Sequence, residues 1–168
     1  MSSGPNYKVK FRRRRTFKTN YSKRLALIKS DKPRLVVRKT NNSTICEFVV
    51  YKPHGDEVKA YFASNSLKKS GWKGHTGNIP AAYLTGYLCA KKALKAEIKE
   101  AVLDLGLATP VHGNRIFAAL KGAIDAGMKI PSDASAFPKE DRIKGKHISA
   151  DAEKNFDEVK SKINKEFD

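Results

Sequence analysis

The chain has 168 residues, of which 34 are Lys or Arg and 17 are Asp or Glu, so its formal net charge is +17. With 40% apolar and 30% charged residues it is long enough to bury a core, and its composition is not that of a wholly disordered chain. No run approaches the ~18 consecutive apolar residues of a membrane span, so we expect no membrane association. A charge this unbalanced points to an anionic partner, and nucleic acid is the first candidate.

The positive charge is concentrated in the first quarter of the chain. Residues 1–39 hold 14 Lys or Arg and one acid, a net charge of +13, whereas residues 131–168 have a net charge of −1. We interpret residues 1–24 as a basic arm. The four adjacent arginines Arg12 to Arg15 repel one another, so the arm should be extended and poorly ordered on its own. No apolar segment follows the first charges, so we expect no secretory signal.

Aromatic side chains are interleaved with the cations of this arm, at Tyr7, Phe11, Phe17 and Tyr21. Cations bind phosphates and flat rings stack on unstacked bases, so the combination is typical of RNA binding. The alternative is a solvated basic tail or a localisation signal.

The segments after the arm predict a short helix followed by the strands of a small sheet. Residues 21–30 predict a short amphipathic helix that ends before Pro33. Residues 34–39, 44–52 and 57–63 predict three strands of an antiparallel meander, with turns at 41–42 and 53–56. Residues 64–71 predict a short helical turn.

The second half of the chain predicts helices around one further strand. Asn78 should cap a helix to about residue 96, whose many small side chains should allow close packing on the sheet. Residues 101–105 predict a buried strand, and Asn114 should cap a helix that Gly127 ends. Residues 130–146 look loop-like. Residues 149–168 predict a charged helix that either packs on the domain or is solvated.

The element order β-β-β-α-β-α predicts a single α/β domain. We expect a mixed sheet of three antiparallel strands plus a parallel, right-handed β-α-β step, with helices packed on it. The predicted organisation is an arm at 1–24, an α/β domain at 25–148 and a C-terminal charged helix at 149–168.

The glycine-rich loop GWKGHTGN at 71–78 is a candidate phosphate site. It lacks the spacing of a P-loop and of the dinucleotide fingerprint. It nevertheless places backbone N–H groups and a helix N-terminus beside Lys73 and His75, which suits a phosphate. Trp72 either stacks on a base or folds into the core. Arg115 begins the later helix, where a cation opposes the helix dipole, so it faces either an anion or a nearby acid.

Catalytic and metal chemistry is not indicated. The four histidines lie in separate segments, and Cys46 and Cys89 read as buried, reduced thiols in a cytosolic protein. The carboxylates Asp56, Asp104 and Asp125 do not make a convincing nuclease set. We therefore expect no cofactor, no metal and no small-molecule substrate.

Several stretches together resemble a known family. They are GPNYKVKFRRRRTFKTNYSKRL, KPRLVVRKTNN, GWKGHTGNIPAAYLTG, FAALKGAIDAG and FPKEDRIKGKHI, between about residues 4 and 148. The chain resembles the archaeal form of large-subunit ribosomal protein L-eighteen, which binds 5S rRNA, and the N-terminal half of its eukaryotic counterpart. The resemblance implies a ribonuclease-H-like sheet without nuclease activity. It also implies a structural role in anchoring 5S rRNA to large-subunit rRNA, beside neighbouring ribosomal proteins in the cytoplasm.

The resemblance also implies which residues face RNA. In the arm and the first helix they are Lys8, Lys10, Arg12, Arg13, Arg14, Arg15, Lys18, Asn20, Tyr21, Lys23 and Arg24. In the glycine-rich loop they are Trp72, Lys73, His75 and Asn78, and near the first strand turn they are Arg38, Lys39 and Asn41. Our reading of the residues adds Arg115. Two rival hypotheses are an RNA-processing enzyme with a basic docking arm and an architectural DNA-binding protein, the latter weakened because no groove-reading helix is recognisable.

Overall fold

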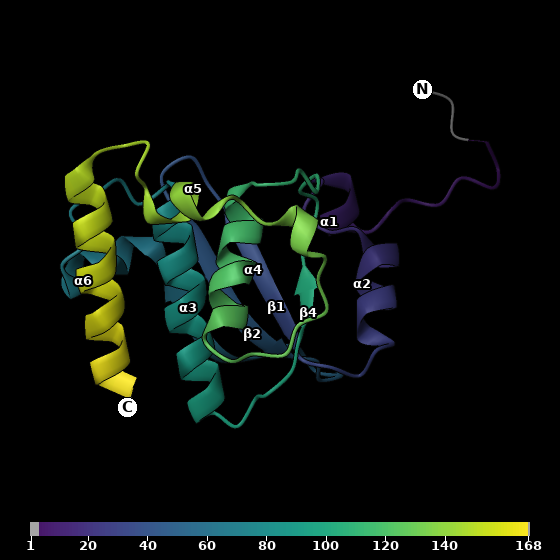
Figure 1. Ribbon diagram of the computed structural model, residues 1–168. Coiled ribbons are helices and arrows are strands. Elements are labelled where there is room, and N and C mark those ends of the chain that lie inside the picture. The colour runs from purple at the N-terminus through teal and green to yellow at the C-terminus, as the bar shows by residue number, and fades with distance from the viewer. Residues whose placement is uncertain (1–3, 168) are drawn as a thin grey trace.

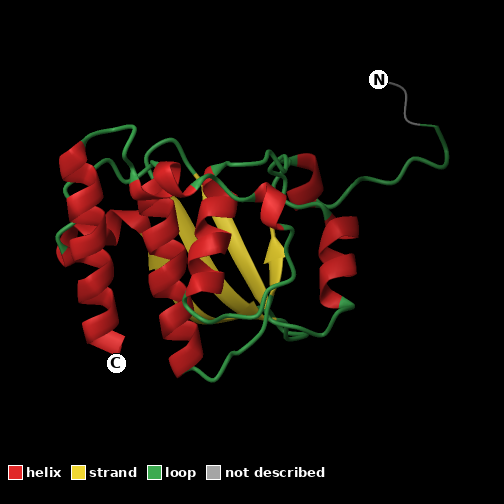
Figure 2. Ribbon diagram, viewed as in Figure 1, coloured by secondary structure: helices red, strands yellow, loops and turns green. Residues whose placement is uncertain are grey.

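A four-stranded mixed sheet forms the centre of the structure, a computed structural model that describes residues 4–167 (Figures 1 and 2). The strands are β1 (Arg34–Lys39), β2 (Thr44–Val50), β3 (Glu57–Ala63) and β4 (Val102–Asp104). The α-helices are α1 (Arg12–Arg15), α2 (Tyr21–Ile28), α3 (Ile79–Lys95), α4 (Arg115–Asp125), α5 (Glu140–Lys144) and α6 (Ala150–Phe167). Two 3₁₀ helices are η1 (Ser64–Ser70) and η2 (Ala134–Ala136). Residues 1–3 of the predicted arm and Asp168 of the predicted last helix lie outside the described residues.

The strand order is β3-β2-β1-β4, as a meander with one added parallel strand requires. β2 pairs antiparallel with β1 and with β3, whereas β4 pairs parallel with β1, Val36 lying opposite Asp104. The predicted single α/β domain with a mixed sheet is therefore confirmed. β2 ends at Val50, two residues earlier than predicted.

The two faces of the sheet differ because successive side chains of a strand point to opposite sides. One face carries Leu35, Val37, Cys46 and Phe48, all fully buried in the core beneath α3 and α4. The opposite face carries Arg34, Arg38, Glu47 and Asp104, which line a cleft shared with the arm residues from Arg13 to Arg24. The second half of the arm therefore lies over the polar face of the sheet, whereas the segment before α1 extends away from the domain (Figure 1).

Small residues in α3 and α4 bring these two helices into contact with each other, rather than only with the sheet as predicted. A Cβ atom added at Gly86 in α3 would lie 2.0 Å from the carbonyl oxygen of Ala119. A Cβ atom added at Gly122 in α4 would lie 2.2 Å from the carbonyl oxygen of Tyr83. Each helix thus places a glycine against the backbone of the other.

The structure differs from the sequence-based expectation in two segments. The arginine run Arg12–Arg15 forms one helical turn instead of extended chain, because its exposed side chains diverge into solvent and Arg13 Nε donates to Thr19 Oγ1 at 2.8 Å. The supposed loop at 130–146 contains η2 and α5. Glu140 and Asp141 favour the N-terminus of α5 through its dipole, and Gly145 ends it at a φ of 80°.

The last helix, α6, is a packing helix. Phe156, Val159 and Ile163 are buried in the same core as the sheet and α3, and Phe167 packs against its edge. Figure 1 shows α6 on the side of the molecule away from α2. None of the helices within residues 4–167 combines the length and apolar character needed to cross a bilayer.

Both cysteines lie in the core as free thiols, which predicts chemical inertness. Burial raises the pKa of Cys89 to about 12 and raises the pKa of Cys46 well above its ordinary value. Because the thiolate is the reactive form, we expect neither thiol of the native protein to react with Ellman's reagent at pH 8. Both should react after unfolding in guanidinium. Rapid reaction of either thiol in the native state would show that α3 separates from the sheet more easily than its packing implies.

Candidate nucleic-acid interface

The arm presents cations that have no acidic partner. Within residues 4–167, none of the Lys and Arg side chains between Lys8 and Lys18 forms an ion pair with a carboxylate. Its rings are equally uncovered, since Phe11 is 72% and Phe17 84% exposed. Exposed rings among cations without acidic partners are typical of a surface that binds another molecule, nucleic acid in particular.

A groove runs along this arm. It is lined by Lys10, Arg14, Arg15, Phe17, Thr19, Asn20, Tyr21, Ser22 and Leu107. The ring of Tyr21, at the start of α2, lies 5.3 Å from the ring of Phe11, which brings the segment before α1 into contact with α2. The lining combines cations for phosphates with rings for bases.

The residues that begin α2 divide into exposed and structural ones. The Asn20 side chain caps the helix by accepting the Lys23 backbone N–H at 3.1 Å, and the Lys23 side chain is exposed. Arg24 donates two hydrogen bonds to the Asp56 carboxylate, at 2.8 and 2.7 Å. Arg24 is therefore engaged within the protein.

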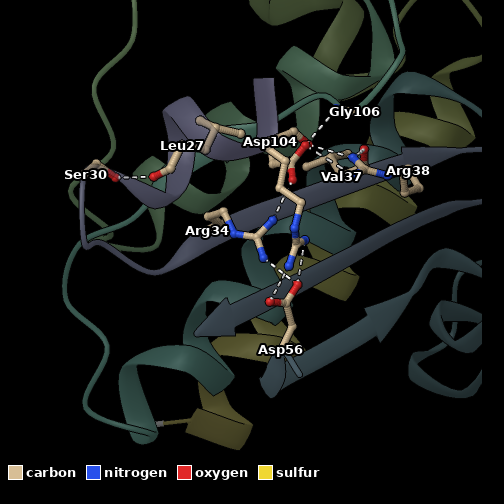
Figure 3. Close-up of polar contacts among 9 residues, drawn as sticks. Leu27, Ser30, Arg34, Val37, Arg38, Asp56, Asp104 and Gly106 are labelled. Atoms are coloured by element: carbon tan, nitrogen blue, oxygen red, sulfur yellow. Dashed lines mark hydrogen bonds and ion pairs between the residues drawn. The ribbon is translucent and has the colours of Figure 1, made fainter. Parts of the chain in front are cut away.

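Beneath α2, alternating arginines and carboxylates form a chain of ion pairs on the polar face of the sheet. Figure 3 shows Arg34 between Asp104 and Asp56, at 3.0 and 2.6 Å. Arg38 lies on the far side of Asp104, at 3.2 Å from its Oδ1 and 2.8 Å from its backbone oxygen. The hydrogen bonds from Arg24, and then those from Arg34, hold the pKa of Asp56 below its ordinary value.

The carboxylates considered as a nuclease set are thus separated by arginines. Asp125 is elsewhere, accepting a hydrogen bond from the Tyr83 hydroxyl at 2.8 Å and pairing with Lys121. In the part of the chain that the structure describes, no three His, Cys, Asp or Glu side chains are placed to hold a metal ion.

The glycine-rich loop is built around Trp72, whose ring is only 3% exposed. Its Nε1 donates to the His75 carbonyl at 3.3 Å, and a Cβ added at Gly74 would lie 2.7 Å from the ring. The expectation that Trp72 stacks on a base is therefore corrected, because the ring is part of the core. The Lys73 side chain is exposed, and so is His75, although its Nδ1 also accepts the Gly77 backbone N–H at 3.0 Å.

Arg115 joins this loop to the turn between β1 and β2. Its guanidinium donates to the carbonyls of Thr40 and Gly77, at 2.9 and 2.8 Å, and Thr76 donates to the Asn42 carbonyl at 2.6 Å. Among the described residues Arg115 therefore bonds to two backbone oxygens and pairs with no acid. These bonds hold the C-terminal half of the glycine-rich loop, with His75, against the turn that follows the exposed Lys39 and contains the exposed Asn41. Figure 1 shows α1 at the same end of the molecule as the N-terminal ends of α3 and α4.

The sequence-predicted site residues therefore fall into two groups. Those with exposed side chains are Lys8, Lys10, Arg12, Arg13, Arg14, Arg15, Lys18, Tyr21, Lys23, Lys39, Asn41, Lys73 and His75. Those whose side chains are held by contacts within the protein are Asn20, Arg24, Arg38, Trp72, Asn78 and Arg115. Arg38 is exposed as well, and Asn78 caps α3 by accepting the Ala81 N–H at 2.9 Å. The exposed group, together with the exposed rings of the arm, is called the basic surface below.

Asn155 of α6 is a supporting residue that the sequence analysis missed. Its side-chain oxygen accepts the Lys73 N–H and its amide donates to the Gly71 carbonyl, both at 3.0 Å. We expect Asn155→Ala to lower the free energy of unfolding by about 1–2 kcal/mol, because two partly buried backbone groups lose their partner. Urea denaturation measures this change, with the exposed neighbour Lys154→Ala as control. Equal stability of the two variants would contradict the role of Asn155.

The fold and the basic surface define the class of this protein, which is a small α/β protein with a cationic arm. Comparison with known proteins then defines the family. The family model described as "Ribosomal large subunit proteins 60S L5, and 50S L18" matches residues 5–100 and 96–133. The chain is 54% identical over 154 residues to large ribosomal subunit protein uL18 of Korarchaeum cryptofilum (strain OPF8), covering 92% of this chain and 79% of that protein.

The chain belongs to this family of large-subunit ribosomal proteins. Its role is that of a structural component of the large ribosomal subunit in the cytoplasm, and its partners are rRNA and ribosomal proteins. It is not an enzyme, so the RNA-processing hypothesis is not supported.

Proposed function

We propose that this chain binds 5S rRNA and anchors it to the rRNA of the large subunit. The observation that carries the proposal is the arm, whose cations from Lys8 to Lys18 have no acidic partner among the described residues and whose Phe11 and Phe17 rings are largely exposed. The positive charges of residues 1–39 repel one another, and a bound polyanion would offset this repulsion. RNA supplies both phosphates for the cations and unstacked bases for the rings.

The basic surface has two parts that suit two contacts. The arm and the start of α2 provide the groove of cations and rings. Lys39, Asn41, Lys73 and His75 lie in or next to the two loops that Arg115 joins, the glycine-rich loop and the turn between β1 and β2. Arg and Lys contacts to phosphate fix position and orientation without reading sequence. Recognition would therefore depend on the shape of folded RNA, with the arm rings selecting unstacked bases.

Competition binding tests this proposal. Purified full-length protein is bound to labelled 5S rRNA, and unlabelled 5S rRNA, a transfer RNA and duplex DNA compete at equal salt. We expect 5S rRNA to compete at least ten times better than the others. If about eight phosphates are engaged, log K should fall with log salt with a slope of roughly −6 to −7. Equal competition by duplex DNA would favour the architectural DNA-binding hypothesis instead.

A further inference from the structure

We propose that Asp56 is a positioning residue, which holds α2 and the attached arm in the orientation that binds RNA through its ion pair with Arg24. Arg24 then acts on Asp56 instead of on a phosphate, in contrast to the assignment implied by the family resemblance. This inference rests on the proposed function for its binding readout, and on the structure alone for its second readout.

The contact between Arg24 and Asp56 is held in place by ion pairs on the sheet. Arg24 Nη1 and Nη2 reach both carboxylate oxygens, in the fork geometry that makes such pairs strong and directional. Asp56 Oδ2 also accepts from Arg34, whose side chain is 3% exposed and is held by Asp104 in turn. A chain of ion pairs, buried at Arg34 and half-buried at Asp56 and Arg24, therefore connects the sheet to α2.

Little else holds α2 against the domain. The helix has eight residues and none of them is buried, and Leu25 is 56% exposed. An isolated helix of this length is unstable in water, so its position depends on a few contacts. The two-pronged ion pair is the contact best placed to set its orientation. Because the arm runs directly into α2, that orientation also sets where the arm's cations point.

The position of Asp56 means that the proposal and a simple charge effect predict opposite changes in RNA affinity when Asp56 is replaced. Asp56 is an acid in a cleft that also contains Arg13, Lys18 and Lys23. If charge alone governed binding, removing this carboxylate would make the surface more positive and strengthen RNA binding. If Asp56 positions the arm, removing it weakens binding, because only the correctly oriented fraction of molecules binds well.

The test compares Asp56→Asn with Asp31→Asn, which makes the same charge change at an exposed residue close behind α2. We expect Asp56→Asn to bind 5S rRNA about fivefold more weakly. This is the size of loss expected when a single half-buried ion pair that orients the arm is removed. Asp31→Asn should bind as well as the wild type or better. Unchanged or tighter binding by Asp56→Asn would overturn the proposal.

Arg24→Gln provides a second variant that leaves Arg34 paired with both carboxylates, so the proposal stays testable even if Asp56→Asn fails to fold. Its matched control is Lys29→Gln, at the end of the same helix. We expect Arg24→Gln to lose more affinity than Lys29→Gln, and the double variant Arg24→Gln/Asp56→Asn to be no weaker than either single variant. Losses that multiply would show that Arg24 touches RNA independently of Asp56.

Hydrogen exchange of the RNA-free protein separates the two proposals. Amides of α2 should exchange faster in Asp56→Asn and Arg24→Gln than in the wild type, while those of β1 and α3 stay protected. If the wild type does not bind 5S rRNA but this exchange pattern is found, the proposed function fails and the positioning role stands. Unchanged exchange in α2 in both variants would refute the positioning role.

Discussion

Deleting residues 1–18 should weaken 5S rRNA binding by about a hundredfold or more at moderate salt and make the remaining binding much less salt-dependent. The deletion removes seven cations, from Lys8 to Lys18, that lack acidic partners in the described structure. Each lost phosphate contact should reduce the slope of log K against log salt by about 0.7–0.9, so the slope should fall by up to about 6. Filter binding over a salt series measures both quantities.

The same deletion should leave the domain intact. No residue from Gly4 to Lys18 is buried, and the deletion keeps the Asn20 cap and the pair between Arg24 and Asp56. The thermal unfolding midpoint should therefore change little. A folded truncated protein that binds 5S rRNA as tightly as the full chain would show that the arm is not the RNA-binding element.

Gly86→Ala should lower the free energy of unfolding by about 3 kcal/mol or more, because the added methyl group forces α3 and α4 apart. Its Cβ would lie 2.0 Å from the Ala119 carbonyl oxygen, and backbone cannot rotate away as a flexible side chain can. Helix propensity alone predicts the opposite sign, since Ala is favoured over Gly in a helix interior by about 1 kcal/mol.

Chemical denaturation measures the effect of Gly86→Ala, and Gly122→Ala tests the reciprocal contact from the other helix. Ala90→Gly, a change in the opposite direction in the same helix, controls for propensity. Its expected loss is smaller, about 1 kcal/mol plus the loss of one buried methyl group. A gain in stability from both glycine substitutions would show that the two helices do not meet as closely as the structure has them.

The strands and long helices were predictable because their signals are local. β1 and β3 begin and end where alternation and turn residues place them, and Asn78 and Asn114 cap α3 and α4 as the sequence indicates. The short elements were not predictable. The arginine run looks too repulsive for a helix, yet one turn costs little when every side chain is solvated.

The basic surface was predictable in outline but not residue by residue. The sequence shows that Arg24 and Arg38 are cations, but not that they pair with Asp56 and Asp104, 32 and 66 residues away. Likewise Trp72 in a glycine-rich loop is compatible with stacking or with burial, and only the fold decides. Asn155 gave no local signal at all, because its partners lie more than 80 residues earlier.

The sheet of this protein thus uses its two faces differently. One face carries the apolar core beneath α3 and α4, and the other carries the ion pairs that reach α2. We infer that rigidity on the first face supports the domain, while the charges on the second orient the arm.

The central claim is that 5S rRNA is the partner of this basic surface. The most direct measurement is to purify the tagged full-length protein from its own cells at raised salt, after dissociating ribosomes with EDTA, and to sequence the RNA that remains bound. The account predicts that 5S rRNA is the most enriched RNA, and that the enrichment disappears when residues 1–18 are removed. Enrichment of another RNA, with 5S rRNA at background level, would contradict it.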